Sequence, residues 1–184
     1  HASLIDGMRL SRAKRVVFPH LDLNYLEDAL ARETGGGQRI VVVESIFSMD
    51  GDRAPLAQLV GLCERFAANL IVDEAHSTGV EGREGRGLTD DADRSDCVLA
   101  TIHTCGKALA SMGAFVAGSR ILRDFLTNHA RPFIFTTALP PYCAAHVREG
   151  LTLSQRADAE RAHLRHLGEY VRARMCAAGF DAGR

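Results

Sequence analysis

Two short segments of the sequence carry polar side chains directly after an apolar run. Asp73 and His76 follow Leu70–Val72, and Lys107 follows the run 97–103. Because apolar runs of this length indicate buried strands, we expect the acid, the imidazole and the lysine at the ends of neighbouring strands. A lysine can form a Schiff base with a carbonyl, and a carboxylate can pair with a cationic ring nitrogen. This is the set of groups that a pyridoxal 5'-phosphate (PLP) enzyme needs.

Lys107 is the most informative single residue. The only other lysine is Lys14, whereas arginines are many. Lys107 stands in a run of small residues, from Gly106 to Gly113, after a predicted buried strand, so we expect it to be poorly solvated and available as a free amine. Thr104 has a hydroxyl suited to a phosphate oxygen, and Gly106 lets the backbone approach a cofactor closely. A solvated surface lysine is the alternative, which these flanking residues disfavour.

Asp73 and His76 also have ordinary structural interpretations. Burial disfavours the ionised form of Asp73, and a protonated pyridine nitrogen would be the cationic partner that keeps it charged. Alternatively, Asp73 caps the following turn through backbone N–H groups. His76 could hydrogen-bond the phenolic oxygen of the cofactor or be a partly exposed loop histidine. Ser48, in the turn 45–52 after another apolar run, could donate to a ring substituent. The short spacing of Asp73 and His76 favours a site.

The composition is that of an ordinary soluble globular protein. The 184 residues are 46% hydrophobic and 24% charged, with a formal net charge of −1, which is enough for one sizeable core. Near-neutral charge gives no support to a nucleic-acid or anionic-membrane partner, and no apolar run is long enough to cross a bilayer. The five cysteines contain no C-x-x-C pair, so we expect a cytoplasmic protein without disulfides and without a metal site.

Strands and helices alternate along the predicted chain. We expect strands at 15–18, 39–44, 70–72, 97–103 and 114–117. We expect helices at 23–32 with Asp22 as N-cap, 55–69, 121–130 and 140–178, the last one broken once. Strand–helix–strand units with short connections predict an α/β fold, a mostly parallel sheet with helices on both faces. Ligands of such sheets bind beyond the carboxyl ends of the strands.

A helicase interpretation is open, because residues 73–76 read Asp-Glu-Ala-His, the metal-binding box of one helicase class. Such a protein also needs a G-x-x-x-x-G-K-[ST] phosphate loop. Here Ala108 follows Lys107, and Thr101 stands where the first glycine of the loop would be. The lysine motif and the near-neutral charge count against this class.

Three further alternatives concern the same residues. A metal site formed by His76, His103 and Cys105 is one, although two ligands one residue apart on a strand are poorly spaced. A Cys105 nucleophile with a histidine base is another, but no feature selects that cysteine except its position near the lysine. The last is a non-catalytic α/β domain that serves an assembly.

Taken together, the motifs resemble one known family. The sequence is similar to the α-oxoamine synthases, which are PLP enzymes of fold type I. The matching stretches run in family order along almost the whole chain, at residues 1–7, 44–52, 73–79, 85–87, 103–108 and 133–141. Only their joint occurrence is specific. The resemblance implies that the chain forms part of the large domain of a PLP-dependent transferase of fold type I.

The resemblance implies four catalytic residues. Lys107 is the implied Schiff-base lysine, and it also moves the α-proton of the substrate. Asp73 is the implied partner of the pyridine nitrogen, and His76 contacts the ring oxygen. His1 is implied to stack on the face of the cofactor ring, a role that its position alone does not indicate.

The resemblance also implies further cofactor contacts. Ser48 is implied to contact the ring oxygen and Thr104 the phosphate. Thr136 and Thr137 are implied to reach the phosphate of the neighbouring subunit, because family sites form between two protomers. The expected assembly is therefore a homodimer with shared active sites.

The implied reaction joins an amino acid to an acyl thioester such as an acyl-CoA, with loss of carbon dioxide. The runs 103–109 and 130–138 are most similar to the biotin-biosynthesis branch, which uses L-alanine and pimeloyl-CoA or a pimeloyl carrier protein, while branches that use glycine or serine share the core motifs. Both ends of the sequence read as cut. We expect residues 1–170 to be the central part of the PLP-binding large domain, and 171–184 to begin the connection to a C-terminal small domain. Residues 1–184 alone are expected to be inactive.

Overall fold

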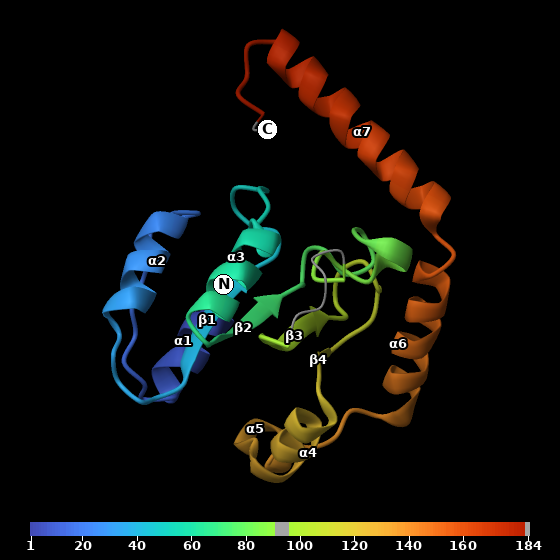
Figure 1. Ribbon diagram of the computed structural model, residues 1–184. Helices are drawn as coiled ribbons and strands as arrows, with labels where there is room; N and C mark the ends of the chain where they lie inside the picture. Colours follow the sequence, from blue (N-terminus) through green and yellow to red (C-terminus); the bar gives the residue numbers. More distant parts are fainter. Residues whose placement is uncertain (91–95, 183–184) are drawn as a thin grey trace.

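One four-stranded sheet organises the chain in the computed structural model, which describes residues 1–90 and 96–182 (Figure 1). The strands lie in chain order as β1 (Arg39–Glu44), β2 (Ala68–Asp73), β3 (Val98–Thr104) and β4 (Ala114–Gly118). β1 pairs with β2 and β2 with β3 in parallel, whereas β4 runs antiparallel to β3. The predicted α/β class with a mostly parallel sheet is confirmed.

The helices surround this sheet, and α7 extends away from it (Figure 1). Their bounds are α1 (Ala2–Leu10), α2 (Leu23–Arg32), α3 (Leu56–Arg65), α4 (Arg120–His129), α5 (Arg131–Ile134), α6 (Pro141–Ser154) and α7 (Asp158–Ala177), with a 3-10 turn at Arg83–Gly85. Within the two described ranges, no helix is long and apolar enough to cross a membrane.

The core lies between one face of the sheet and the helices α2 and α3. Val41 and Val43 of β1 are buried, while the neighbouring Ile40 is 51% exposed. Because side chains alternate along a strand, one face of β1 therefore carries the buried residues. The apolar stripes of the two helices pack against this face with Leu26, Leu30, Leu59, Val60 and Cys63. Burial raises the pKa of the Cys63 thiol to about 12, so this cysteine is a neutral core residue.

Most predicted elements are present, but at the N-terminal end one predicted strand is absent and one helix was missed. The predicted strand at 15–18 is not a strand, and Val17 is 87% exposed, so this short apolar run does not join the core. α1 was not predicted. The helix expected over 55–69 ends at Arg65, because Ala67 adopts a left-handed backbone (φ 49°) and β2 begins directly afterwards. Asp22 caps α2 as expected, accepting a hydrogen bond from the Tyr25 amide.

The long C-terminal helical region has the predicted single break, between α6 and α7. Arg161 is buried at this corner, where its Nη1 donates to the Ser154 carbonyl at 2.7 Å and its Nη2 to Asp158 at 2.5 Å. The same guanidinium reaches the Gly79 carbonyl at 3.4 Å, which joins the corner to the loop after β2. The predicted domain boundary after residue 170 falls inside α7 and stays a prediction.

Candidate active site

The predicted acid, Asp73, lies at the carboxyl end of a parallel strand, at the edge of the sheet. Asp73 is the last residue of β2, and it lies opposite Glu44 of β1 and Ile102 of β3. Backbone hydrogen bonds continue past this point, from Ser45 N–H to the Asp73 carbonyl at 2.9 Å and from Glu74 N–H to the Ile102 carbonyl at 2.8 Å. Asp73 is only 7% exposed. The expected partly buried carboxylate at this edge is therefore present.

The Asp73 side chain also caps the turn that follows it. Its Oδ1 accepts a hydrogen bond from the Ala75 amide at 2.9 Å. The structural interpretation of this residue is thus correct, and it does not exclude the functional one, because a carboxylate has a second oxygen.

Lys107 and His76 come together although they are far apart in the sequence. The distance between Lys107 Nζ and His76 Nε2 is 2.8 Å. Because a lysine ammonium has only donors, His76 Nε2 is the acceptor in this contact when Lys107 is charged. The expectation of a poorly solvated lysine is wrong for this structure, since Lys107 is exposed. Its small neighbours Gly106 and Ala108 are exposed as well, and they carry no side chains that would cover the amine.

Glu74 anchors the turn between Asp73 and His76. It is fully buried, and its carboxylate accepts the amides of Leu88 and Thr89 at 3.1 and 2.7 Å and the hydroxyls of Ser77 and Thr89. Burial acts to raise the pKa of Glu74, but the hydrogen bonds from Ser77 and Thr89 outweigh it and hold the pKa below its usual range. Gly87, with φ 100°, leaves room for the carboxylate, since a Cβ there would lie 2.8 Å from it.

His103 is a buried histidine that the sequence placed only in the alternative metal site. Its Nδ1 lies 2.8 Å from Thr78 Oγ1 and its Nε2 lies 2.8 Å from Thr101 Oγ1. The ring stacks on Phe115 of β4 with a centroid distance of 4.8 Å. Burial lowers the pKa of His103, and the charges of Glu74 and Asp73 oppose this shift only in part.

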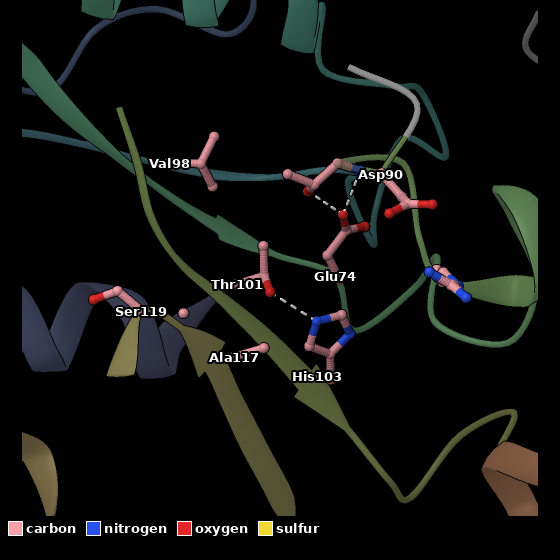
Figure 2. A pocket seen from close by; sticks show the side chains of 10 residues that line it. Glu74, Asp90, Val98, Thr101, His103, Ala117 and Ser119 are labelled. Atoms are coloured by element: carbon pink, nitrogen blue, oxygen red, sulfur yellow. Dashed lines mark hydrogen bonds between the residues drawn. The ribbon is translucent and has the colours of Figure 1, made fainter. Parts of the chain in front are cut away.

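A cavity of about 300 Å³ lies beside Glu74 and His103 (Figure 2). Its lining also includes Arg86, Thr89, Asp90, Val98, Thr101 and residues 117–119. Figure 2 shows His103 pointing into it with the hydrogen bond to Thr101. Neither Asp73 nor Lys107 lines this cavity. It therefore lies apart from the predicted lysine.

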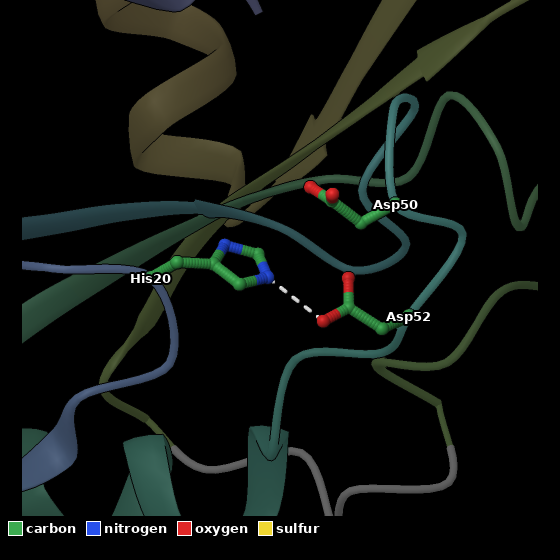
Figure 3. Close-up of side chains that lie close together, drawn as sticks. All are labelled: His20, Asp50 and Asp52. Atoms are coloured by element: carbon green, nitrogen blue, oxygen red, sulfur yellow. Dashed lines mark hydrogen bonds and ion pairs between the residues drawn. The ribbon is translucent and has the colours of Figure 1, made fainter. Parts of the chain in front are cut away.

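Ser48 lies in an exposed turn after β1 that several contacts hold in place. An isolated bridge joins Ile46 to Arg53, and His20 Nε2 lies 2.7 Å from Asp52 Oδ2 (Figure 3). His20, Asp50 and Asp52 are the one trio of potential metal ligands, among residues 1–90 and 96–182, whose ligand atoms lie within 4.8 Å of one another. His20 and Asp50 are exposed. The contact between His20 and Asp52 explains why two of the three side chains lie close together.

His1 and Thr104 lie near the same edge of the sheet. Thr104 is the last residue of β3 and is partly exposed. The α-amino group of His1 lies 2.5 Å from Glu44 Oε1, at the end of β1. The His1 ring contacts Ser3 instead, with Nδ1 2.8 Å from its hydroxyl. The backbone of His1 is thus beside the candidate site, and a ring-stacking role for its side chain stays a prediction.

The family model described as aminotransferase class I and II matches residues 1–184. The chain belongs to this family.

Two curated relatives with similar sequences share one name. The 8-amino-7-oxononanoate synthases of Anaeromyxobacter sp. (strain K) and Lysinibacillus sphaericus are 45% and 41% identical to the chain, over 100% and 98% of its length. The chain covers 46% of each of these proteins. It therefore spans about half the length of the curated relatives that it matches.

Solved structures of the same kind superpose closely on the chain. The serine palmitoyltransferase of Sphingomonas wittichii aligns with a TM-score of 0.91 at 31% identity, over 96% of this chain and 44% of that one. The 8-amino-7-oxononanoate synthase of Francisella tularensis aligns with a TM-score of 0.82 at 32% identity, over 96% and 51%. A further serine palmitoyltransferase structure, with a TM-score of 0.92, is described as carrying a PLP internal aldimine. The predicted resemblance to the α-oxoamine synthases and the fold type are confirmed.

Two alternatives for this member of the aminotransferase family lose their support. The ligand atoms of His76, His103 and Cys105 do not form a group within 4.8 Å in the part of the chain that the structure describes. Cys105 is 2% exposed, and burial raises the pKa of its thiol, which disfavours the reactive thiolate. Neither a metal site nor a cysteine nucleophile fits these residues.

Thr136 and Thr137 lie in the exposed connection between α5 and α6. Phe133 and Phe135 beside them are 64% and 72% exposed. The implied role of the two threonines in a neighbouring subunit stays a prediction.

Proposed function

We propose that the complete protein containing this chain is a PLP-dependent C-acyltransferase that condenses an amino acid with an acyl thioester and releases carbon dioxide. The observation that carries the proposal is the approach of Lys107 Nζ to within 2.8 Å of His76 Nε2, beyond the strand end that holds the buried Asp73. The names of the similar proteins support the same reaction class.

The residues present fit PLP by their chemistry. Lys107 offers an exposed primary amine for a Schiff base, and Asp73 offers a carboxylate fixed at the end of β2 for the pyridine nitrogen. His76 and Ser48 would hold the ring oxygen, and Thr104 the phosphate. When bound, PLP would supply the electron sink for a carbanion at the substrate α-carbon.

The protein side chains supply binding, orientation and proton transfer. His76 Nε2 accepts a hydrogen bond from Lys107 Nζ and so fixes the direction of the amine. A lysine held in this way can remove and return the α-proton of an amino acid once its amine is free. Asp73, fixed by the turn amide of Ala75, would keep a cationic partner in place.

L-Alanine and a pimeloyl thioester are the substrates that we favour, as in biotin biosynthesis, because the two curated relatives named above are 8-amino-7-oxononanoate synthases. Serine palmitoyltransferase chemistry is the second candidate, since such structures superpose with TM-scores above 0.9. Glycine C-acetyltransferase and 5-aminolevulinate synthase share the core motifs. A family-like domain kept for assembly is the non-enzymatic alternative, and it predicts no PLP binding.

The Lys107→Ala variant of the complete protein tests the proposal. We expect wild-type protein mixed with PLP to show the visible absorbance band of lysine-bound PLP, and Lys107→Ala to lose both the band and thiol release from acyl-CoA. Lys14→Ala, which changes the other lysine of this chain, serves as the control and should keep both. Alanine, glycine and serine, each with pimeloyl-, acetyl-, succinyl- and palmitoyl-CoA, identify the substrates. A band and an activity that survive Lys107→Ala would overturn the proposal.

A further inference from the structure

A buried hydrogen-bond chain connects the two segments that carry the candidate catalytic residues. Thr78 belongs to the turn after Asp73 and His76, and His103 belongs to the strand that leads to Thr104 and Lys107. Thr78 Oγ1 lies 2.7 Å from the Glu74 carbonyl and 2.8 Å from His103 Nδ1. Thr78 and His103 are 4% and 8% exposed. These two residues are therefore shielded from solvent. In such a buried place a hydrogen bond is strong, and a missing partner is most unfavourable.

The positions of the protons in this chain follow from counting donors. A carbonyl oxygen only accepts, so the single hydroxyl proton of Thr78 goes to the Glu74 carbonyl. Thr78 Oγ1 must then accept from His103, which places a proton on His103 Nδ1. Burial favours the neutral ring, so His103 Nε2 accepts from the Thr101 hydroxyl at 2.8 Å. One tautomer of His103 satisfies every group.

The ring of His103 is held on its faces as well as at its nitrogens. It stacks on Phe115 of β4, with the two ring planes 12° apart. His103 is directly opposite Phe115 in the antiparallel pairing of β3 with β4. The imidazole therefore has a fixed position, and it can transmit that position to the turn that Thr78 closes.

We propose that His103 is a positioning residue: its neutral, Nδ1-protonated ring joins the turn of Asp73 and His76 to the strand of Lys107 and so sets the geometry of the His76–Lys107 pair. The proposal deepens the proposed function, on which it rests, by adding a residue that does not touch the reacting groups. Its basis is that both partners of the 2.8 Å Lys107–His76 contact extend from segments that His103 connects. A small displacement of such a pair can lower a catalytic rate about a hundredfold.

Two pairs of variants separate the hydrogen bond from the packing. His103→Asn keeps a donor near the place of Nδ1, whereas His103→Leu has a similar size and keeps none. Thr78→Ser keeps the hydroxyl, whereas Thr78→Val removes it. His163→Leu, on the exposed surface of α7, is the matched histidine control. Thermal unfolding followed by circular dichroism reports whether each variant is folded.

The first measurement uses the protein without PLP. We expect nitrogen-15 NMR of the side chain to show a neutral His103 with its proton on Nδ1. A proton on Nε2 alone, or a charged ring at neutral pH, would overturn the inference. This outcome does not depend on whether the protein binds PLP.

The second measurement is the pH titration of the visible band of lysine-bound PLP in the complete protein. We expect His103→Leu and Thr78→Val to move its midpoint by at least about half a pH unit and to lower kcat about tenfold to a hundredfold. His103→Asn, Thr78→Ser and His163→Leu should titrate like the wild type. If the folded Leu and Val variants also do so, His103 is only structural and the inference is wrong. If the wild type shows no band, the proposed function fails instead.

Discussion

At the scale of single residues, the two adjacent carboxylates Asp73 and Glu74 have opposite roles. Asp73 ends β2 at the candidate site, while the Glu74 carboxylate is fully buried under the loop at Leu88 and Thr89. Two backbone amides and two hydroxyls satisfy it, so it stays ionised although it is buried. The turn that carries His76 is thereby fixed by an anion that has no part in the proposed chemistry.

The lowered pKa of Glu74 predicts a particular pH dependence of stability. A carboxylate with a folded pKa below its unfolded value stabilises fully above the unfolded value of about 4.3, and this stabilisation is lost as the pH falls through the folded pKa. Glu74→Gln places an amide group against donors, so we expect it to lower the free energy of unfolding by about 1–3 kcal/mol at pH 7. The difference from wild type should shrink below about pH 4.

Urea unfolding at several pH values measures this difference. Glu169→Gln, on the exposed surface of α7, is the control and should change stability little at any pH. A difference for Glu74→Gln that stays constant from neutral to acid pH would contradict the prediction.

At the scale of elements, the sequence predicts the strands that form continuous apolar runs. It does not predict features that depend on contacts between residues far apart in the chain. β1 and β2 are apolar runs bounded by polar residues, so both were found, and with them Asp73 and His76. The run at 15–18 is also apolar, but it has no partner strand among the described residues, and it remains exposed. His103 could not be assigned its place, since its contacts come from Thr78 and Phe115, which the sequence does not bring together.

The junction between α3 and β2 gives a prediction at this scale. Ala67 is exposed and has a left-handed backbone, which is unfavourable by about 1–2 kcal/mol for a residue with a Cβ. Glycine adopts this conformation without that penalty. Its unfolded chain is more flexible, however, so folding costs glycine about 0.5–1 kcal/mol more in chain entropy than alanine. We therefore expect Ala67→Gly to raise the free energy of unfolding by up to about 1 kcal/mol.

Ala162→Gly is the matched control, because Ala162 is exposed inside α7. It should lower the free energy of unfolding by about 1 kcal/mol. Guanidinium unfolding of the two variants should thus give shifts of opposite sign. Equal destabilisation by both would show that the left-handed backbone at position 67 carries no strain.

At the scale of the whole molecule, the segment from α4 to the start of α6 is one of the regions that leave large apolar side chains uncovered. From α4 to the start of α6, Phe125, Phe133, Phe135, Leu139 and Tyr142 are between 55% and 72% exposed. Figure 1 shows α4 and α5 close together at the lower end of the view, away from α2 and α3. Exposed apolar surface of this kind is typical of interfaces, and we predict that this one joins two copies of the complete protein. Thr136 and Thr137 lie between Phe135 and Leu139 of this region, and their role in a neighbouring subunit stays a prediction.

Phe135→Asp tests whether this surface joins two copies and completes the site. A charge in an apolar interface loses hydration without gaining a partner, so we expect the complete protein to change from dimer to monomer in sedimentation velocity at micromolar concentration. Thr136 and Thr137 would then no longer reach the phosphate site of the other subunit. Because one or two charge-assisted hydrogen bonds would be lost, PLP affinity should fall about tenfold or more. Val17→Asp, at an exposed apolar residue outside this region, should change neither property. A Phe135→Asp monomer that binds PLP as tightly as the wild type would show that PLP binding does not need the second copy. That result would contradict the shared-site prediction.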